Sequence, residues 1–410
     1  MNNGFGKIFG ASIERRSLLK AGVGTAAMLA MPGIVGRAFA EEDLKIGWVR
    51  PLTGPLASSF AALYAAGDIA LEEINSAGGV LGRKLVKVEV DDAGAPANEP
   101  IVMRELINQG VKFVVGPVGS SQTLASLAVS TPAKIIQCGY ITASEGGDGT
   151  RYPYHYQCGY HVSTQAVKYA EYLAKTPFKK IGVLVEDSAA GTSVLAACKT
   201  ELPAKGLELV GEQISPLRST DLTPFLRALR SAGAEALCCF VSNNIDVTQL
   251  FVGLQRLNWK PTVVGHTGLV FASADQAVPA EARYPDAYAA SYQALTFVEG
   301  EEPDARVKAY VDKVLGLGLA PGSLPPAATS PYYDFLHVLK HAIEETKSVD
   351  TDRVKAYLDT LSGFDGIYGK INFTAENHTC YGPEAAAMAQ VFAPESPLLL
   401  SSQGLFRPRG

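Results

Sequence analysis

Residues 45–50 (KIGWVR) are a short, mostly apolar run, and residues 51–55 (PLTGP) follow it with two prolines and a glycine. Proline cannot donate a ladder hydrogen bond, so the first run predicts a strand that stops at Pro51. From Phe60 to Ile74, apolar residues recur at steps of three and four, which predicts a helix with one buried face. Gly78 and Gly79 end this helix, because glycine adopts positive φ without strain.

A second β-rich run, Leu85–Val90, follows the helix, and two strands joined through a helix predict a right-handed parallel crossover. The alternation continues, with strands predicted at 112–116, 134–138, 180–186, 208–214, 236–240 and 262–265 and helices at 97–109, 121–130, 163–174, 189–205, 222–232, 245–257, 303–315, 332–346 and 352–361. The first series predicts a doubly wound sheet, and the second is long enough to form a lobe of its own. The chain is therefore predicted to be an α/β protein.

The first 40 residues are predicted to be an export signal rather than part of the fold. The paired Arg15 and Arg16 precede an apolar stretch from Ala21 to Met31, and an A-x-A cleavage site ends at Ala40. The arginine pair resembles the twin-arginine type of signal. The alternative, a membrane anchor, needs about 18 or more apolar residues, and this run is shorter. We expect a cleaved, exported, periplasmic and soluble protein.

The charge balance and the cysteines exclude several classes of protein. The chain has 36 Lys and Arg against 41 Asp and Glu, and the leader carries mostly basic charge, so the mature chain is acidic and unsuited to nucleic acid. Six cysteines show no C-x-x-C pair, which gives a zinc or redox site little support. We expect buried small apolar residues, including adjacent Cys238 and Cys239, with a bridge between Cys138 and Cys158 as an alternative.

Several short motifs together resemble the type I periplasmic solute-binding proteins, typified by the Leu/Ile/Val-binding proteins of bacterial ABC importers. They are IG at 46–47, PLTGP at 51–55, INSAGG at 74–79, GRKL at 82–85 and DD at 91–92. The likeness continues more thinly through VVGP at 114–117 and the alternation beyond it. It implies two doubly wound parallel-sheet lobes joined by a three-crossing hinge.

The resemblance also implies how the chain divides. The helices after residue 303 would return to the first lobe, and a final hairpin near 369–393 would cross back to the second. The expected domains are the signal at 1–40, a first lobe of 43–159 plus 290–366, and a second lobe of 160–289 plus 367–410, with crossings near 159, 290 and 366. The disulfide that the family would suggest is not expected, because Gly94 and Gly119 occupy those places.

Ligands of open parallel sheets gather at the carboxyl ends of the strands, which directs attention to residues 50–53, 116–123 and 139–144. Ser120 and Ser121 stand at a helix start, where free N–H groups and the dipole attract an anion. Capping of their own helix is the alternative role. The resemblance places Ser120 where a family serine binds the ligand α-carboxylate.

The loop after the fourth strand contains Tyr140 and Thr142. The spacing of Thr142 and Glu145 matches a capping box, which would explain the threonine without a ligand. The resemblance implies instead that the main chain at Tyr140 and the hydroxyl of Thr142 complete a carboxylate clamp. Arg50, at the end of the first strand, is a further candidate for gripping a carboxylate, with an interlobe salt bridge as its alternative.

The second lobe departs from the family pattern. Thr267 stands where amino-acid binders carry a glutamate for the ligand ammonium, Asn243 stands where a tyrosine is expected, and a second tyrosine expected near Ala190 is missing. A buried ammonium without a counter-charge is costly, which disfavours an unmodified α-amino acid unless another acid supplies the charge. Three candidates for that charge are Glu186, Asp187 and Asp246.

Other motifs favour structural roles. His337 and His341 lie four residues apart on a predicted helix with Asp334 one turn earlier, but no third metal ligand is evident and a solvated face is the simpler interpretation. No G-x-S-x-G elbow occurs. We expect no metal, no cofactor and no catalysis.

The predicted function is that of an extracytoplasmic solute-binding protein of an ABC uptake system, a monomer that docks to a permease in the cytoplasmic membrane. Hydroxyl groups for an anion and no evident cation partner predict a small carboxylate with an apolar or aromatic body, such as a hydrophobic amino acid, a keto acid or an aromatic acid. The alternatives are a sensor of amides or urea-like ligands with the same fold, and a hydrolase that uses Ser120 or Thr267.

Overall fold

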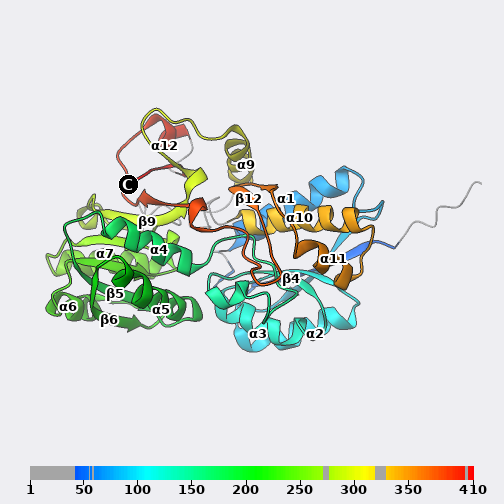
Figure 1. The fold of residues 1–410 in the computed structure, drawn as a ribbon, viewed down its shortest axis with the longest axis horizontal. Coiled ribbons are helices and arrows are strands. Elements are labelled where there is room, and N and C mark those ends of the chain that lie inside the picture. The colour runs from blue at the N-terminus through cyan, green and yellow to red at the C-terminus, as the bar shows by residue number, and fades with distance from the viewer. Residues whose placement is uncertain (1–41, 55, 58–59, 271–276, 319–328, 402–404) are drawn as a thin grey trace, which may run out of the picture. The chain divides into compact units, whose positions relative to one another are not determined.

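The structure is a computed structural model that describes residues 42–54, 56–57, 60–270, 277–318, 329–401 and 405–410, shown as a ribbon in Figure 1. The export signal predicted at residues 1–40 lies outside these ranges. Among the described residues, no helix combines the length and the apolar character needed to cross a membrane.

The described chain contains two main parallel sheets. Their strands are β1 (Leu44–Arg50), β2 (Leu85–Asp91), β3 (Phe113–Val118), β4 (Ile136–Tyr140), β5 (Lys180–Glu186), β6 (Glu208–Ser215), β7 (Ala236–Phe240), β8 (Thr262–Gly265), β9 (Ala287–Tyr292) and β13 (Ala386–Gln390). The first sheet has the order β2-β1-β3-β4, and the second has the order β13-β9-β8-β7-β5-β6, with only β13 antiparallel to its neighbour. The predicted α/β fold with two doubly wound sheets is confirmed.

Helices cover both faces of each sheet (Figure 1). The α-helices are α1 (Ala61–Ser76), α2 (Glu99–Asn108), α3 (Ser120–Ser130), α4 (Val162–Leu173), α5 (Ala189–Ala204), α6 (Thr223–Ser231), α7 (Asn244–Arg256), α9 (Ala305–Leu315), α10 (Ser330–Thr346), α11 (Thr351–Leu358) and α12 (Pro397–Ser401). Two short pairs complete the structure, β10 (Thr296–Phe297) with β14 (Arg407–Pro408) and β11 (Phe364–Gly366) with β12 (Gly369–Ile371).

Strand β1 shows why this sequence forms a sheet buried on both faces. Ile46 and Trp48 belong to the core that includes α1 and α10, whereas Val49 belongs to the core formed with α2. Consecutive side chains of a strand point to opposite faces, so an apolar run rather than an alternating one is needed here. In α1, Gly67 is packed so closely on the Trp48 ring that an added Cβ would lie 3.0 Å from it.

Two motif residues of the first third hold its turns. The Asn75 amide donates to the carbonyl of Leu85 at 2.9 Å and accepts from the N–H of Leu85 at 2.8 Å, which joins the end of α1 to the start of β2. The carboxylate of Asp91 accepts from the hydroxyl of Thr53 at 2.7 Å and from the N–H of Leu52 at 2.9 Å. The motifs therefore stabilise local turns that place the strand ends.

The chain passes between the two sheets three times, after β4, after β9 and after β12. The passing segments contact one another, since Gln157 N–H donates to the His378 carbonyl at 2.8 Å and Cys380 N–H donates to the Gln157 carbonyl at 3.1 Å. Tyr292 lies against Tyr160 and Tyr368, with ring centroids 4.5 Å and 4.4 Å away.

The predicted final hairpin over 369–393 is wrong. Strand β12 pairs with β11, and β13 pairs instead with β9 at the edge of the second sheet. Strand patterning marks where extended segments lie but carries little information about which distant strand will pair with them. Helix α10, predicted at 332–346, begins two residues earlier, at Ser330, and has Pro331 in its first turn.

Candidate binding cleft

A cleft of about 400 Å³ lies between loops at the carboxyl ends of the two sheets. We call its two sides the first wall and the second wall. The first wall is lined by Leu56, Phe60, Gly94, Pro96, Gly119, Ser120, Ser121, Gln122, Tyr140 and Thr142, and the second by Glu186, Ser188, Ala190, Leu217, Arg218, Phe240, Ser242, Asn243, Asn244 and His266. The cleft therefore lies where open parallel sheets hold ligands.

Two loops of the first wall are joined directly by hydrogen bonds. Gly119, at φ 101°, donates its N–H to the carbonyl of Tyr140 at 2.9 Å. The Ser120 hydroxyl oxygen accepts from the N–H groups of Thr142 and Ala143, both at 3.2 Å. The left-handed backbone at residue 119 favours glycine and turns the start of α3 toward the neighbouring loop. The loops after β3 and β4 thus form one unit.

The serines at the start of α3 do not cap it. Gly119 occupies the cap position, no side chain caps it, and Ser120 is the first helical residue, 8% exposed. Because the Ser120 oxygen accepts from the other loop, its hydrogen is available to a ligand in the cleft. The first N–H groups of a helix have no intrahelical acceptor, so this wall offers several donors together.

The capping box predicted at Thr142 and Glu145 is wrong. The short helix η2 (Ser144–Gly147) follows Ala143, which has no side-chain cap. The Glu145 carboxylate instead accepts from the hydroxyl of Ser193 in α5 at 3.0 Å. Thr142 is half-buried and lines the cleft. The spacing of Thr142 and Glu145 predicted a helix cap, but Glu145 instead accepts a hydrogen bond from a residue 48 positions away in the chain.

Tyr140 lines the cleft with its ring. Its ring centroid lies 5.8 Å from that of Phe60, and burial raises the pKa of its hydroxyl. Phe240 and His266, whose rings lie 4.4 Å apart, line the opposite wall. The sequence analysis identified neither residue: Phe240 ends the strand predicted at 236–240, and His266 directly follows the strand predicted at 262–265.

The structure places Arg50 outside the cleft. Its guanidinium pairs with Glu89 of neighbouring β2 at 3.3 Å and lies over the ring of Tyr64 at 5.1 Å. The salt bridge lies within one sheet, so it is not the interlobe bridge that was the alternative role of Arg50. Arg50 is not among the residues that line the cleft, and its position at the end of a strand could not predict these contacts.

Asn243 and Thr267 are placed differently in the second wall. The Asn243 side chain caps α7, accepting from the N–H of Asp246 at 3.1 Å, and also lines the cleft. Thr267 lines a smaller inner pocket of about 20 Å³ that shares Tyr140, Thr142 and His266 with the cleft. Of the seven candidate residues, the cleft lining brings together Ser120, Ser121, Tyr140, Thr142 and Asn243.

One acid among the three sequence candidates lines the cleft. Glu186, at the end of β5, is 3% exposed, and burial raises its pKa to about 7 against the opposing hydrogen bonds from Ser242 and Ser188. Asp187 is exposed and outside the lining. Asp246 is buried and accepts from the N–H of Arg218 at 3.0 Å.

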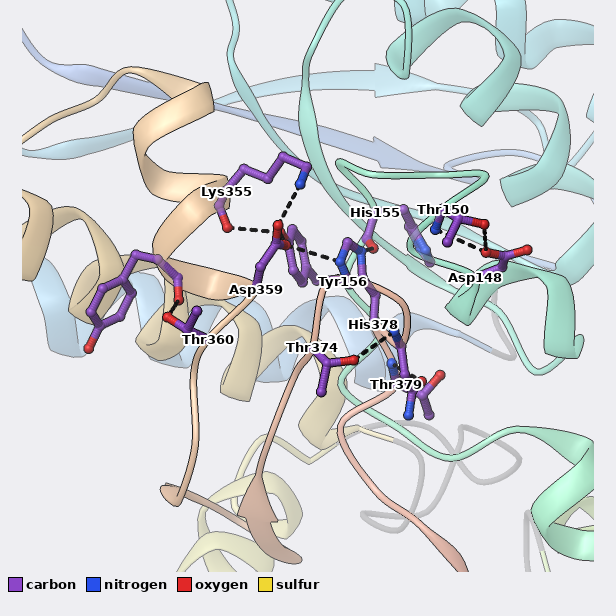
Figure 2. A network of polar contacts seen from close by, with 12 residues as sticks. Asp148, Thr150, His155, Tyr156, Lys355, Asp359, Thr360, Thr374, His378 and Thr379 are labelled. Carbon is purple, nitrogen blue, oxygen red and sulfur yellow. Dashed lines mark hydrogen bonds and ion pairs between the residues drawn. The ribbon is translucent and has the colours of Figure 1, made fainter.

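A buried polar network contains His155 and His378 (Figure 2), and His155 contacts the loop that carries Thr142. The Nε2 atom of His155 accepts from Gly139 N–H at 3.1 Å, so its Nδ1 carries the proton and contacts the Gly146 carbonyl at 2.6 Å. Burial lowers the pKa of His155 to about 4, which keeps the ring neutral. This histidine therefore fixes both ends of the loop that carries Thr142.

The same network joins that region to the third passing segment (Figure 2). His378 contacts the His155 carbonyl through Nδ1 at 2.8 Å and Asp359 through Nε2 at 3.1 Å. Tyr156 and Lys355 donate to the same carboxylate at 2.6 Å and 2.5 Å. Burial opposes ionisation of Asp359, but these partners lower its pKa to about 2. The charge is paired, as a buried network requires.

The histidines and cysteines singled out in the sequence have structural partners. His337 Nε2 lies 3.4 Å from Glu73, His341 Nε2 lies 2.9 Å from the hydroxyl of Tyr357, and Asp334 accepts from the Ile367 N–H at 3.0 Å. These contacts differ from the predicted solvated face. All six cysteines are buried free thiols, including Cys138 and Cys158.

Fold and cleft together define an α/β protein with two parallel sheets and a cleft at the carboxyl ends of their strands. The chain belongs to the type I periplasmic binding proteins of the Leu/Ile/Val-binding family: residues 43–394 match the family described as periplasmic binding protein. The predicted membership is confirmed.

Relatives include the Leu/Ile/Val-binding protein BraC3 of Rhizobium johnstonii, 31% identical over 43% of this chain and 49% of the relative. Another is the Leu/Ile/Val-binding protein homolog 3 of Brucella melitensis, 29% identical over 52% of this chain and 57% of the relative. The chain thus matches about half the length of these curated relatives.

Solved structures share the fold. LivJ of Streptococcus pneumoniae, in complex with isoleucine, has a TM-score of 0.72 at 21% identity, covering 85% of this chain and 95% of that one. A solute-binding protein of an ABC transporter from Rhodopseudomonas palustris, in complex with p-hydroxybenzoic acid, has a TM-score of 0.75 at 17% identity, covering 90% and 96%.

Proposed function

We propose that this chain is the extracytoplasmic solute-binding protein of an ABC uptake system and that it captures a small carboxylate with an apolar or aromatic body. The observation that carries the proposal is the joining of two first-wall loops by Ser120 at the edge of the cleft. The Ser120 and Thr142 hydroxyls and the N–H groups that begin α3 would bind the carboxylate. Such donors favour an anion through both hydrogen bonds and the helix dipole.

The rings of the cleft favour an apolar or aromatic body. Phe60 and Tyr140 line the first wall, and Phe240 and His266 line the second. Apolar surface removed from water between such rings contributes about 25 cal/mol per Å². Isoleucine and p-hydroxybenzoic acid, the ligands of two structural neighbours, are both small carboxylates with such bodies.

The ligand would act by changing the balance between an open and a closed form. The cleft has donors on both walls, and the Ser193 hydroxyl already donates to Glu145 of the facing loop at 3.0 Å. A ligand that contacts both walls binds the closed form better than the open one and so increases its population. The closed monomer would then dock to its permease, and its work is binding rather than catalysis.

The leader supports export. The twin-arginine pair at Arg15 and Arg16 and the cleavage site at Ala40 are those of a protein delivered to the periplasm. We expect purified periplasmic protein to begin at residue 41, which N-terminal mass analysis checks.

Titration calorimetry with hydrophobic amino acids, keto acids and aromatic acids tests the binding proposal. Ser120→Ala and Thr142→Val should each weaken the best acid by about 1 to 3 kcal/mol, because each removes a donor to a charged group. Ser130→Ala, at the opposite end of the same helix α3, is the matched control and should leave the affinity unchanged.

Normal acid binding by both first-wall variants would contradict the proposed clamp. Failure of every acid to bind, together with binding of acetamide or urea, would favour the alternative of an amide sensor with the same fold. A ligand that prefers the native state also raises the melting temperature, so thermal shift gives an independent measure.

A further inference from the structure

Glu186 is a carboxyl group built into the second wall of the cleft. It ends β5, directly before the loop that starts α5, and it is 97% shielded from solvent, being only 3% exposed. It lines the cleft together with Ser188 and Ser242. Burying a carboxyl group without hydrogen-bond partners destabilises the folded state, so the groups around Glu186 need to be identified.

Three hydrogen bonds from the protein hold this carboxyl in place. Ser242 donates its N–H to Oε2 at 2.9 Å and its hydroxyl, shared between both oxygens, at 2.8 Å and 2.9 Å. Ser188 donates its hydroxyl to Oε1 at 3.1 Å. The Ser242 hydroxyl carries a single hydrogen, so three donor hydrogens face the roughly four lone-pair sites of the carboxylate, and a donor from a ligand can use the site that this hydrogen leaves.

The three groups that donate hydrogen bonds to Glu186, the Ser242 N–H and the hydroxyls of Ser242 and Ser188, are all neutral. Burial and, to a smaller extent, the nearby Asp246 carboxyl raise its pKa, and Arg218 lines the same cleft. With a pKa of about 7, the group is partly ionised at neutral pH, and a donor or a cation from a ligand would favour the ionised form. An anionic group at this place would be repelled.

We propose that Glu186, oriented by Ser188 and Ser242, is the acceptor subsite of the second wall, and that the ligand is an acid which also carries a hydrogen-bond donor, a hydroxyl or an ammonium, for this subsite. The inference rests on the proposed binding of a carboxylate at the first wall. It names the ligand class more narrowly: a molecule with a carboxylate on one side and a donor directed at the other wall.

The neighbouring acids do not compete for this role. Asp187 follows in sequence but is exposed and outside the cleft lining, and Asp246 accepts through Oδ2 from the Asn243 amide at 2.6 Å and from the N–H of Arg218 at 3.0 Å. Neither lines the cleft. Of these three acids, Glu186 is therefore the one whose side chain can meet a ligand in the cleft.

Matched ligand pairs test the proposal by titration calorimetry. In the first arm, 4-hydroxybenzoate is compared with benzoate, which differ by the hydroxyl; in the second, leucine is compared with 4-methylpentanoate, which differ by the ammonium. In at least one arm, wild-type protein should bind the donor-bearing acid about 10- to 100-fold more tightly. Glu186→Gln should reduce that ratio to less than about threefold while leaving the affinity for the donor-free acid nearly unchanged.

The arm in which the ratio collapses identifies the donor as hydroxyl or ammonium. Asp187→Asn is the matched control and should keep the wild-type ratio, and Ser242→Ala should reduce the ratio partly, because it removes a bond that orients Glu186.

A purely structural role of Glu186 would weaken the binding of both members of a pair equally. Equal binding of both members by wild-type protein, or an unchanged ratio in Glu186→Gln, would overturn the subsite while leaving the proposed function standing; absence of binding to any acid would overturn both.

Discussion

The two walls of the cleft hold their polar groups in different ways. The first wall uses mainly backbone N–H groups, joined across two loops by the Ser120 hydroxyl. The second wall uses side chains, with Glu186 held by Ser188 and Ser242. Backbone donors at a helix start suit any anion, whereas a single oriented carboxyl selects among ligands. The comparison suggests that the first wall binds the carboxylate that all the candidate ligands share, and that the second wall selects among these ligands by their hydrogen-bond donor.

Two buried glutamates sharpen this comparison. Glu99 begins α2 beside Asp92, and burial together with that neighbouring acid raises its pKa to about 10. Glu186 is similarly buried, but three donors limit the rise of its pKa to about 7. Glu99 is thus held neutral at pH 7, whereas Glu186 is close to its pKa at that pH. The neighbouring groups, and not burial alone, determine how far each pKa rises.

The largest expected effect comes from breaking the support of the first wall. His155→Ala should lower stability by about 2 to 4 kcal/mol, because it leaves Gly139 N–H and the Gly146 carbonyl unpaired and opens a cavity. Acid affinity should fall with it as the loop carrying Thr142 loosens. Urea denaturation and calorimetry measure the two effects.

His341→Ala is the control for that variant. Its ring contacts the hydroxyl of Tyr357 and is not part of the cleft lining, so the variant should leave acid binding unchanged. A His155→Ala protein as stable as the wild type would show that the network does not hold the first wall.

A pH series of stability compares the two glutamates directly. For an acid whose folded pKa is raised, the native state keeps a proton that the unfolded state releases above about 4.5, so stability is lost as pH rises toward the folded pKa. Glutamine cannot incur this loss. The gain in stability of Glu99→Gln over wild type should therefore grow with pH from about 4.5 toward about 10, by roughly 1.4 kcal/mol per pH unit at most.

For Glu186→Gln the corresponding gain should level off near pH 7. Denaturant midpoints between pH 5 and pH 9 separate the two profiles. Identical profiles for both variants would mean that the hydroxyl donors of the second wall do not tune Glu186.

The smallest expected effect concerns Arg50. Because its guanidinium pairs with Glu89 rather than entering the cleft, Arg50→Gln should change acid affinity by less than about 0.5 kcal/mol. Calorimetry with the best acid checks this. A tenfold loss would mean that the ligand draws Arg50 into the first wall.

Much of the fold could be predicted because its signals are local. The strands expected at 180–186, 236–240 and 262–265 lie where the structure has β5, β7 and β8. Apolar runs bounded by glycine and proline specify such elements within a few residues. The partner of β13 could not be predicted in the same way, because pairing depends on distant segments.

The candidate site, too, combines residues that local signals could predict with contacts that depend on distant segments. Ser120 and Thr142 could be found from strand ends, a helix start and a family resemblance, but their contact joins residues 22 positions apart through the adjacency of β3 and β4. Arg50 could not be excluded from sequence, because the direction of a long side chain depends on Glu89 and Tyr64 beside it.

By itself, the sequence determined the alternation of strands and helices, the turns that end them and the loop tips where an anion could bind, since these depend on the periodicity and backbone preferences of neighbouring residues. Only the tertiary structure decided which acid faces the cleft. Glu186 became a cleft residue because β5 lies beside β7, which brings Ser242 to it from 56 positions away. Such long-range contacts form only when the sheets assemble, so no local pattern records them.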